Sequence, residues 1–297
     1  MKAAVVGDRG VAVRDVPRPA PAPNEVLIRV HASSLNRADL IVASGQPHGK
    51  LFGTGSRLGL ECAGEVEAVG SEVADLKAGD RVMASAPGGF AEYAVTDWGR
   101  VHRIPANNMT YEQATCFPVA LQTIHNAVVT AGRFKRGETL LIQGASSGVG
   151  LMGMQIGKLM GASLVIGTST NAQRRARLKE FSCDLALDSG DPKWPEQVKE
   201  GTGGKGVNLI VDMVSGVVAN QNHALKRIDY IGVTFRTRSI DEIREINRLM
   251  HADLWPTVEA GKLSLPIYET YPLDDIAEAL ALMRSNQHFG KIVISIG

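Results

Sequence analysis

The chain has 297 residues, and at about 100 to 200 residues per domain this length predicts two domains. Hydrophobic residues make up 44% and charged residues 21%, which is the balance of an ordinary globular protein and excludes the disordered and fibrous classes. The formal net charge is +1, so no general field attracts nucleic acid or a membrane surface, and we expect neither as a partner.

Residues 1–6 run directly into a strand-like segment that lacks the long apolar core of a signal peptide. No apolar run reaches 18 residues, so the sequence predicts a cytoplasmic protein without a membrane-spanning helix. Cys62, Cys116 and Cys183 lie far apart and form no C-x-x-C pair, which argues against a disulfide framework and a four-thiolate zinc site.

The first hundred residues alternate short β-rich runs with turns rich in glycine and proline. This pattern predicts a compact, mostly β domain. Four prolines within residues 17–23 predict an extended connector across that domain, because proline is excluded from helix interiors and central strands. The expected strands are residues 2–6, 25–32, 63–69, 81–84 and 90–95.

After Pro118 the pattern changes to strands alternating with helices, which predicts a doubly wound parallel sheet of the Rossmann type. The expected strands are residues 139–143, 163–168, 184–187, 207–213 and 230–235. The expected helices are residues 149–160, 172–181, 217–227 and 240–254, and the tail adds a helix over 273–283 and a strand over 291–296. The fold class is therefore α/β with a second, mostly β domain.

A glycine-rich turn lies between the apolar strand 140–143 and the helix that follows it. Small residues here let backbone N–H groups approach a pyrophosphate, and the N-terminus of a helix favours its negative charge. A tight structural turn is the alternative, but the two β-α units that follow favour nucleotide binding. The expected contacts are Gly144, Ser146, Ser147, Gly148, Val149 and Gly150.

The second strand of this domain ends without the acidic residue that an NAD-specific fold places there to bind the ribose hydroxyls. Ser169 follows the strand instead, and Arg174 and Arg175 come soon after. Hydroxyls and arginines suit a 2′-phosphate, so the sequence predicts NADPH, with solvated surface arginines as the alternative.

Two competing interpretations fail on sequence grounds. Short-chain reductases carry their glycine-rich turn near the N-terminus and need a Tyr-x-x-x-Lys pair, and this chain has no such pair. The seven histidines form no H-E-x-x-H motif and no closely spaced pair with a cysteine, so we expect no catalytic metal.

Several further segments match one family pattern together with the glycine-rich turn. They are Ser34-Leu35-Asn36-Arg37-Ala38-Asp39, residues 58–66, 78–82 and 88–93, and His288-Phe289-Gly290-Lys291-Ile292-Val293. With these segments, which cover nearly its whole length, the chain resembles the zinc-independent quinone oxidoreductases of the medium-chain dehydrogenase/reductase superfamily, whose second domain is GroES-like.

The resemblance implies roles for individual residues. Asn36 should lie by the nicotinamide and the substrate, Thr123 should touch the nicotinamide, and Arg174 should bind the 2′-phosphate. Taken alone, Asn36 fits a turn residue and Thr123 a helix cap equally well. A homodimer is a further expectation of the resemblance.

Zinc-dependent members of the superfamily carry a cysteine where this chain has Arg37, and a histidine where it has Leu60. Without a Lewis acid the enzyme cannot readily stabilise an alkoxide, so the expected substrate is a quinone or a small α,β-unsaturated carbonyl. The resemblance places the substrate domain at about residues 1–117 with 257–297, and the dinucleotide-binding domain at about 118–256.

Two departures from the family pattern bear on function. Pro47 stands where many relatives have a tyrosine, which counts against enoyl-thioester reduction that relies on a phenol as proton donor. Between Asn220 and His223 the chain lacks a strand and linker of roughly 25 to 30 residues that relatives carry. We therefore expect strand 230–235 to pair beside strand 207–213, and a catalytically weak NADPH-binding sensor or structural relative remains an alternative.

Overall fold

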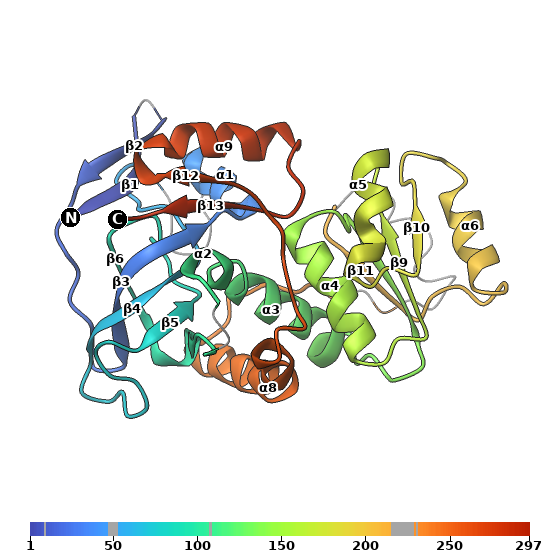
Figure 1. Cartoon of the computed structure of the whole chain (residues 1–297), viewed down its shortest axis with the longest axis horizontal. Coiled ribbons are helices and arrows are strands. Elements are labelled where there is room, and N and C mark those ends of the chain that lie inside the picture. Colours follow the sequence, from blue (N-terminus) through green and yellow to red (C-terminus); the bar gives the residue numbers. More distant parts are fainter. Residues whose placement is uncertain (9, 47–52, 107–108, 215–228, 230) are drawn as a thin grey trace. The chain divides into compact units, whose positions relative to one another are not determined.

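The computed structural model describes residues 1–8, 10–46, 53–106, 109–214, 229 and 231–297. The chain forms two compact units (Figure 1). Unit 1 comprises Met1–Val119 and Phe235–Gly297, and unit 2 comprises Ala120–Thr234. The units separate at 119/120 and 234/235, whereas the domains expected from the sequence separate at 117/118 and 256/257.

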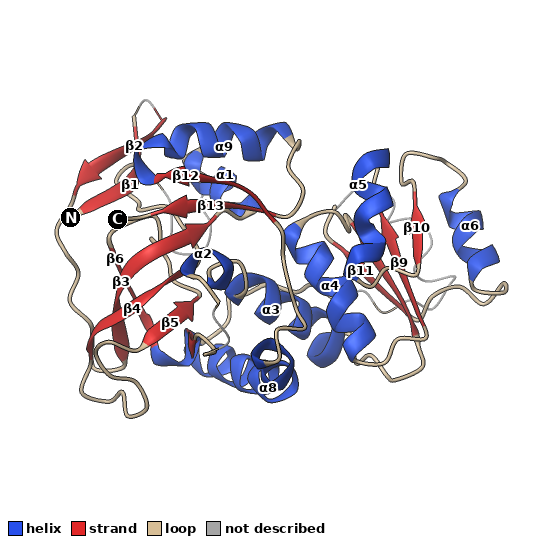
Figure 2. Ribbon diagram, in the orientation of Figure 1, coloured by secondary structure: helices blue, strands red, loops and turns tan. Residues whose placement is uncertain are grey.

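Unit 1 is built mainly of antiparallel strands, shown in red in Figure 2. One sheet has the order β12-β13-β3-β4-β5-β7, with β6 also paired to β3, and β1 and β2 form a separate hairpin. The strands are β1 (Lys2–Gly7), β2 (Gly10–Asp15), β3 (Glu25–Ser34), β4 (Cys62–Val69), β5 (Arg81–Ala84), β6 (Tyr93–Asp97), β7 (Val101–Arg103), β12 (Ile267–Pro272) and β13 (Lys291–Ser295).

The core of unit 1 lies between this sheet and helix α9 (Ile276–Ser285). On α9 the buried residues follow a spacing of three and four, which places them on one face of a helix. The helix ends at Asn286, whose φ of 59° lies in the left-handed region that asparagine tolerates. The buried residues of α9 are Ile276, Ala279, Leu280 and Met283.

Helix α8 (Ile240–Glu259) also belongs to unit 1. Ser239 begins it with a capping box, in which Ser239 and Glu242 each accept a hydrogen bond from the other's backbone N–H. Arg244 then binds both carboxylate oxygens of Asp97 at 3.0 and 2.7 Å, which fastens the helix to the end of β6.

Unit 2 contains a parallel sheet with the order β10-β9-β8-β11, and the fold class predicted from the sequence is confirmed. Helix α4 packs on β8 and β9 at close range: a Cβ at Gly157 would lie 2.3 Å from Leu140 Cδ2. The elements are β8 (Thr139–Gln143), α4 (Gly148–Leu159), β9 (Leu164–Thr168), α5 (Ala172–Arg177), β10 (Leu185–Leu187), α6 (Trp194–Gly201) and β11 (Leu209–Asp212).

The shorter helices include two that begin near the site described below. The seven-residue α1 (Arg37–Ala43) starts at Asn36, and α3 (Pro118–His125) runs across the boundary between the units. A π-helix (Asn126–Ala131) continues α3, and α2 (Tyr111–Ala114) precedes it.

The expected strand over residues 230–235 is wrong for its described part. Residues 231–235 adopt no regular structure, and among described residues no strand pairs with the outer edge of β11, where Ile210 is 49% exposed. Residues 231–234 belong to unit 2, and the chain passes from unit 2 to unit 1 directly after them. The helix expected over residues 217–227 lies outside the described residues.

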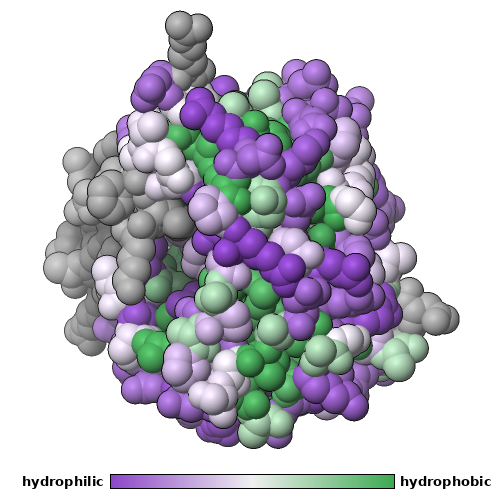
Figure 3. Space-filling view, turned by 90° about the vertical axis from the view of Figure 1, so that its left-hand side faces the viewer, coloured by the Kyte–Doolittle hydropathy of each residue, from purple (hydrophilic) through white to green (hydrophobic). Residues whose placement is uncertain are grey.

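Two further expectations concern the surface. Residues 17–23 are an irregular connector before β3, as their prolines predict. Among the described residues, no helix is both long and apolar enough to cross a membrane. On the face of unit 1 shown in Figure 3, hydrophobic residues lie in patches between hydrophilic ones.

Candidate functional site

Glu61, which directly precedes β4 and is fully buried, is the centre of a polar cluster in unit 1. Its Oε1 accepts hydrogen bonds from Ser34 Oγ at 2.6 Å, Asn36 Nδ2 at 2.7 Å and Lys291 Nζ at 2.8 Å. Its Oε2 accepts from the backbone N–H of Val119, in the first turn of α3, at 2.8 Å. The buried carboxylate is therefore held by two side-chain donors, one cation and one helix N-terminus.

Asn36, expected beside the nicotinamide, is 8% exposed and belongs to this cluster. Its Nδ2 donates to Glu61, while its Oδ1 accepts from Lys291 Nζ at 3.0 Å. These opposite partners determine which end of the amide carries the oxygen, because an ammonium only donates and a carboxylate only accepts. The side chain is thus fixed in one orientation.

Asp39 is a further polar side chain that contacts Asn36. It is fully buried, and its Oδ2 accepts from the backbone N–H of Asn36 at 2.7 Å, which stabilises the start of α1. Burial raises the pKa of Asp39 to about 7; the Asn36 N–H and the charge of Lys291 oppose this rise, and the charge of Glu61 adds to it. Asp39 therefore titrates near neutral pH beside a charged pair.

Arg37 and Leu60 are the residues that the sequence resemblance sets against the zinc ligands of zinc-dependent relatives. The Arg37 guanidinium donates to Asn286 Oδ1 and, at 3.5 Å, to the carbonyl oxygen of Met283, so it caps the C-terminus of α9. A cation and an aliphatic side chain cannot ligate Zn²⁺, and Glu61 is engaged by its own donors. These residues do not fit a catalytic zinc ion.

In unit 2 the glycine-rich turn connects β8 to α4 as the sequence predicts. Gly144 has a φ of 70°, and a Cβ at Gly150 would lie 2.6 Å from the carbonyl oxygen of Gly144, so the turn requires glycine at both positions. Ser147 is the N-cap of α4 and accepts from Gly150 N at 3.1 Å. The N–H groups of Gly148 and Val149 occupy the first turn of a 12-residue helix, where a pyrophosphate can bind.

Ser146 and Ser169 follow neighbouring strands, β8 and β9. Their hydroxyl oxygens lie 3.2 Å apart. The Ser169 backbone is fixed as well, since its N–H donates to Leu187 O and its carbonyl accepts from Arg175 Nη1 at 2.9 Å. Arg175 Nη1 also lies 3.0 Å from Asp188 Oδ2, just after β10. Hydroxyl, arginine and carboxylate groups thus meet at the carboxyl edge of the sheet, where open α/β sheets bind ligands.

The other two expected residues are placed by their helices. Arg174 lies on α5, whose N-cap Asn171 accepts from Arg174 N at 2.9 Å, and its side chain is partly buried. Thr123 lies on α3, four residues beyond Val119, and is partly exposed. The two hydroxyls and the first turn of α4 are donors that fit a dinucleotide, while Arg175 is engaged by Ser169 and Asp188.

Sequence reasoning missed three residues at these sites. Glu61 and Lys291 were noted only within family motifs, and nothing in their spacing shows that they form a buried pair 230 positions apart in sequence. Asp188 could have been found, because it is the first residue after the third strand of the parallel sheet.

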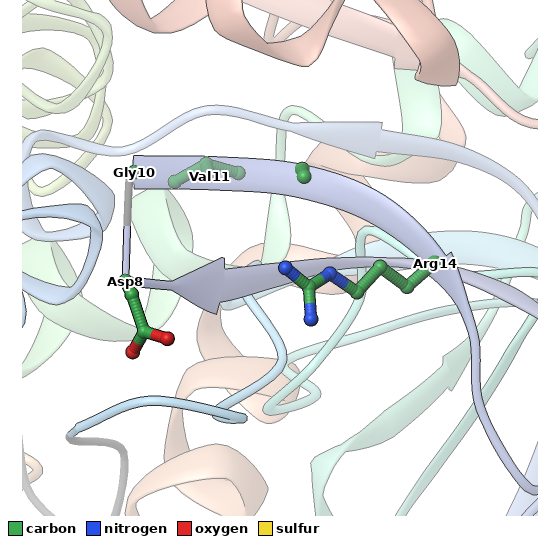
Figure 4. A pocket seen from close by; sticks show the side chains of 5 residues that line it. Asp8, Gly10, Val11 and Arg14 are labelled. Atoms are coloured by element: carbon green, nitrogen blue, oxygen red, sulfur yellow. The ribbon is translucent and has the colours of Figure 1, made fainter.

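A surface hollow of about 340 Å³ at the β1–β2 hairpin, with Asp8 and Arg14 among its lining residues (Figure 4), includes none of the expected site residues.

Two family models match the chain. The alcohol dehydrogenase GroES-like domain matches residues 22–106, and the zinc-binding dehydrogenase model matches residues 148–237. The first lies in unit 1, and the second covers the glycine-rich helix and most of unit 2.

The curated proteins that match the chain include two kinds. The chain is 29% identical over 94% of its length to a mycocerosic acid synthase-like polyketide synthase of Mycobacterium tuberculosis, but spans 14% of that protein. It is 27% identical to human quinone oxidoreductase, with 89% of this chain and 87% of the human protein aligned. The alignment is 292 positions long, which exceeds 89% of this 297-residue chain. The extra positions are residues of the human enzyme that have no counterpart in this chain.

Solved structures show the same fold over the whole chain. A mycobacterial protein complexed with NADPH is 25% identical, with a TM-score of 0.85, and the likeness covers 99% of this chain and 100% of that one. The resemblance drawn from the sequence is confirmed. The chain belongs to the medium-chain dehydrogenase/reductase superfamily.

Proposed function

We propose that the chain is an NADPH-dependent oxidoreductase that passes a hydride, without zinc, to a quinone or a small α,β-unsaturated carbonyl. Membership of the superfamily supports oxidoreductase chemistry. The observation that carries the choice of cofactor is the donor set after β8 and β9: two facing hydroxyls with Arg174 nearby in sequence, and no acidic residue directly after β9.

In this proposal the residues of unit 2 bind and orient the dinucleotide. The first turn of α4 holds the pyrophosphate through the N–H groups of Gly148 and Val149, and Ser146, Ser169 and Arg174 hold the 2′-phosphate. NADPH supplies the hydride when it is bound. The solved relative in complex with NADPH supports this choice.

In this proposal the buried cluster of unit 1, formed by Glu61, Asn36 and Lys291, provides a rigid surface next to the reacting groups. Glu61 and Lys291 hold both ends of the Asn36 amide, so its orientation is set before any ligand arrives. We propose that Asn36 and Thr123 lie beside the nicotinamide, with unit 1 acting as the substrate domain and unit 2 as the dinucleotide-binding domain. The protein would act as a homodimer.

The class of hydride acceptor is proposed from Arg37 and Leu60, the residues set against the zinc ligands of zinc-dependent relatives. Arg37 and Leu60 leave no Lewis acid to stabilise an alkoxide, whereas a quinone or conjugated carbonyl delocalises the charge that hydride addition creates. Quinone reduction can take its protons from water. Human quinone oxidoreductase, with 87% of its length aligned, supports a quinone.

A second candidate is reduction of an enoyl thioester. The alignment of 94% of this chain with a segment of a polyketide synthase favours it. Pro47, which removes the phenol found in many relatives, counts against it, but that position lies outside the described residues. NADPH binding without turnover is a third candidate, which the segment lacking between Asn220 and His223 makes reasonable; that position also lies outside the described residues.

One experiment separates these candidates. NADPH oxidation at 340 nm is followed with a panel of quinones, enones and enoyl-CoA thioesters, and NADPH binding is measured in parallel. Turnover of quinones or enones supports the main proposal, and turnover of thioesters alone supports the second candidate. Tight NADPH binding without oxidation of any substrate would leave only the non-catalytic role.

A further inference from the structure

Arg175 joins two groups at the carboxyl edge of the parallel sheet. A single nitrogen, Nη1, lies 2.9 Å from the carbonyl oxygen of Ser169 and 3.0 Å from Asp188 Oδ2. The distance between the Ser169 carbonyl oxygen and Asp188 Oδ2 is therefore no greater than the sum of these two distances. Asp188 is in this way brought close to Ser169, whose hydroxyl faces that of Ser146.

Asp188 is held in place independently of Arg175. Its Oδ1 accepts from the backbone N–H of Gly190 at 2.9 Å, so loss of the arginine would leave the carboxylate where it is. The Asp188 side chain is 36% exposed and would regain part of its hydration. An unpaired carboxylate here would repel a 2′-phosphate and could accept a hydrogen bond from a 2′-hydroxyl.

We propose that the Arg175–Asp188 pair determines the preference for NADPH over NADH, with Arg175 neutralising an acid that would otherwise exclude the 2′-phosphate. This inference rests on the proposed function, because it concerns the dinucleotide site of unit 2. Arg175 acts as a positioning residue: it fixes the Ser169 carbonyl and screens Asp188, while Arg174 is the residue proposed to touch the phosphate.

The pair differs from an ordinary surface ion pair on the same helix. The Arg175 side chain is 22% exposed and has a second acceptor in Ser169, whereas Arg177 and Glu180 are 49% and 47% exposed and lie three residues apart in sequence. Exposed ion pairs such as Arg177–Glu180 contribute little to stability. Arg177→Ala is therefore a matched control that removes the same charge from α5.

The test measures dissociation constants for NADPH, NADH and 2′,5′-ADP by fluorescence or calorimetry, without turnover. Arg175→Ala should weaken NADPH and 2′,5′-ADP by roughly tenfold or more, the scale of one close charge interaction, and leave NADH unchanged or tighter. Arg175→Ala/Asp188→Asn should restore NADPH affinity to within about threefold of wild type, because the exposed acid is gone. Asp188→Asn alone should leave NADPH binding unchanged or tighter.

Two results would overturn the proposal. If the double variant binds NADPH as weakly as Arg175→Ala, the arginine acts by direct contact and not by screening Asp188. If Arg175→Ala and Arg177→Ala have equal effects, only the overall charge of α5 matters. Failure of wild type to bind either dinucleotide would instead refute the proposed function, which keeps the two ideas distinguishable.

Discussion

The ammonium group of Lys291 lies 2.8 Å from Glu61 Oε1, and the two side chains are 4% and 0% exposed. Lys291 begins β13 and Glu61 directly precedes β4, while β3 lies between these two strands in the sheet. The pair therefore joins β13 and β4, the strands that flank β3 at the end where Asn36 follows it. Four donors around one carboxylate meet the condition under which a buried ion pair is tolerated.

Lys291→Met should destabilise the protein by about 3 to 5 kcal/mol, because it leaves Glu61 charged, buried and without its cation. The measurement is the free energy of unfolding from urea denaturation at pH 7. Lys291→Met/Glu61→Gln should recover part of the loss, since the uncompensated charge is then absent.

Lys158→Met provides the matched control for that variant. Lys158 and Asp184 form a pair of similar length, 2.7 Å, but their side chains are 42% and 34% exposed. We expect a cost of about 1 kcal/mol or less. Equal costs for the two lysine variants would mean that burial of the Lys291–Glu61 pair has no energetic consequence.

Asp39 should make stability depend on pH. Burial raises its pKa from 3.8 to about 7, so the folded protein binds the proton more tightly than the unfolded chain. The associated stabilisation is complete below about pH 4 and is lost as the pH rises to about 7, by about 4 kcal/mol at most. The contribution of Asp39 to the free energy of unfolding should therefore fall over this range.

Asp39→Asn keeps an acceptor for the Asn36 N–H but cannot ionise. Relative to wild type, this variant should become more stable as the pH rises from 5 to 8, in urea denaturation at both values. Parallel pH profiles for the two proteins would show that Asp39 does not titrate in this window.

Most strands were predicted because their patterns are local, as were the helices α4, α5, α8 and α9. The elements not predicted include the shorter helices α1, α2, α3 and α6 and the strands β2, β7 and β12. Strand β8 coincides with the expected residues 139–143, and α4 begins one residue before its expected start. The short α1 was missed, because its stability comes from the buried capping contact between Asn36 and Asp39 and not from helical periodicity. The strand expected over 230–235 was wrong for residues 231–235, because β-rich composition alone does not provide a segment with a pairing partner.

The site was predictable where function depends on consecutive residues. The turn from Gly144 to Gly150 requires glycines at fixed spacing, so its sequence reveals it. The Glu61–Lys291 pair depends on the order of strands in the sheet, and the Arg175–Asp188 pair on the distance between α5 and the end of β10. Such contacts between distant positions leave no mark in a single sequence.

Metal analysis should find no stoichiometric zinc, and chelators should leave activity unchanged. Arg37, which stands in place of a ligand, caps α9 through Asn286, and Leu60 offers no donor atom. Purified protein is analysed by plasma mass spectrometry, and turnover is assayed before and after treatment with EDTA. Activity lost on chelation and restored by added zinc would contradict the zinc-free mechanism.

Arg174→Ala should raise the dissociation constant for NADPH and barely change that for NADH. Charge-assisted hydrogen bonds are worth roughly 1.5 to 3 kcal/mol, which corresponds to about 10- to 150-fold in affinity. Arg177→Ala on the same helix removes an equal charge from an exposed pair with Glu180 and should leave the ratio of the two constants unchanged. Titration of both cofactors against the three proteins, followed by nicotinamide fluorescence, checks this directly. An equal loss for NADPH and NADH in Arg174→Ala would mean that the side chain supports the dinucleotide site in general and does not contact the 2′-phosphate.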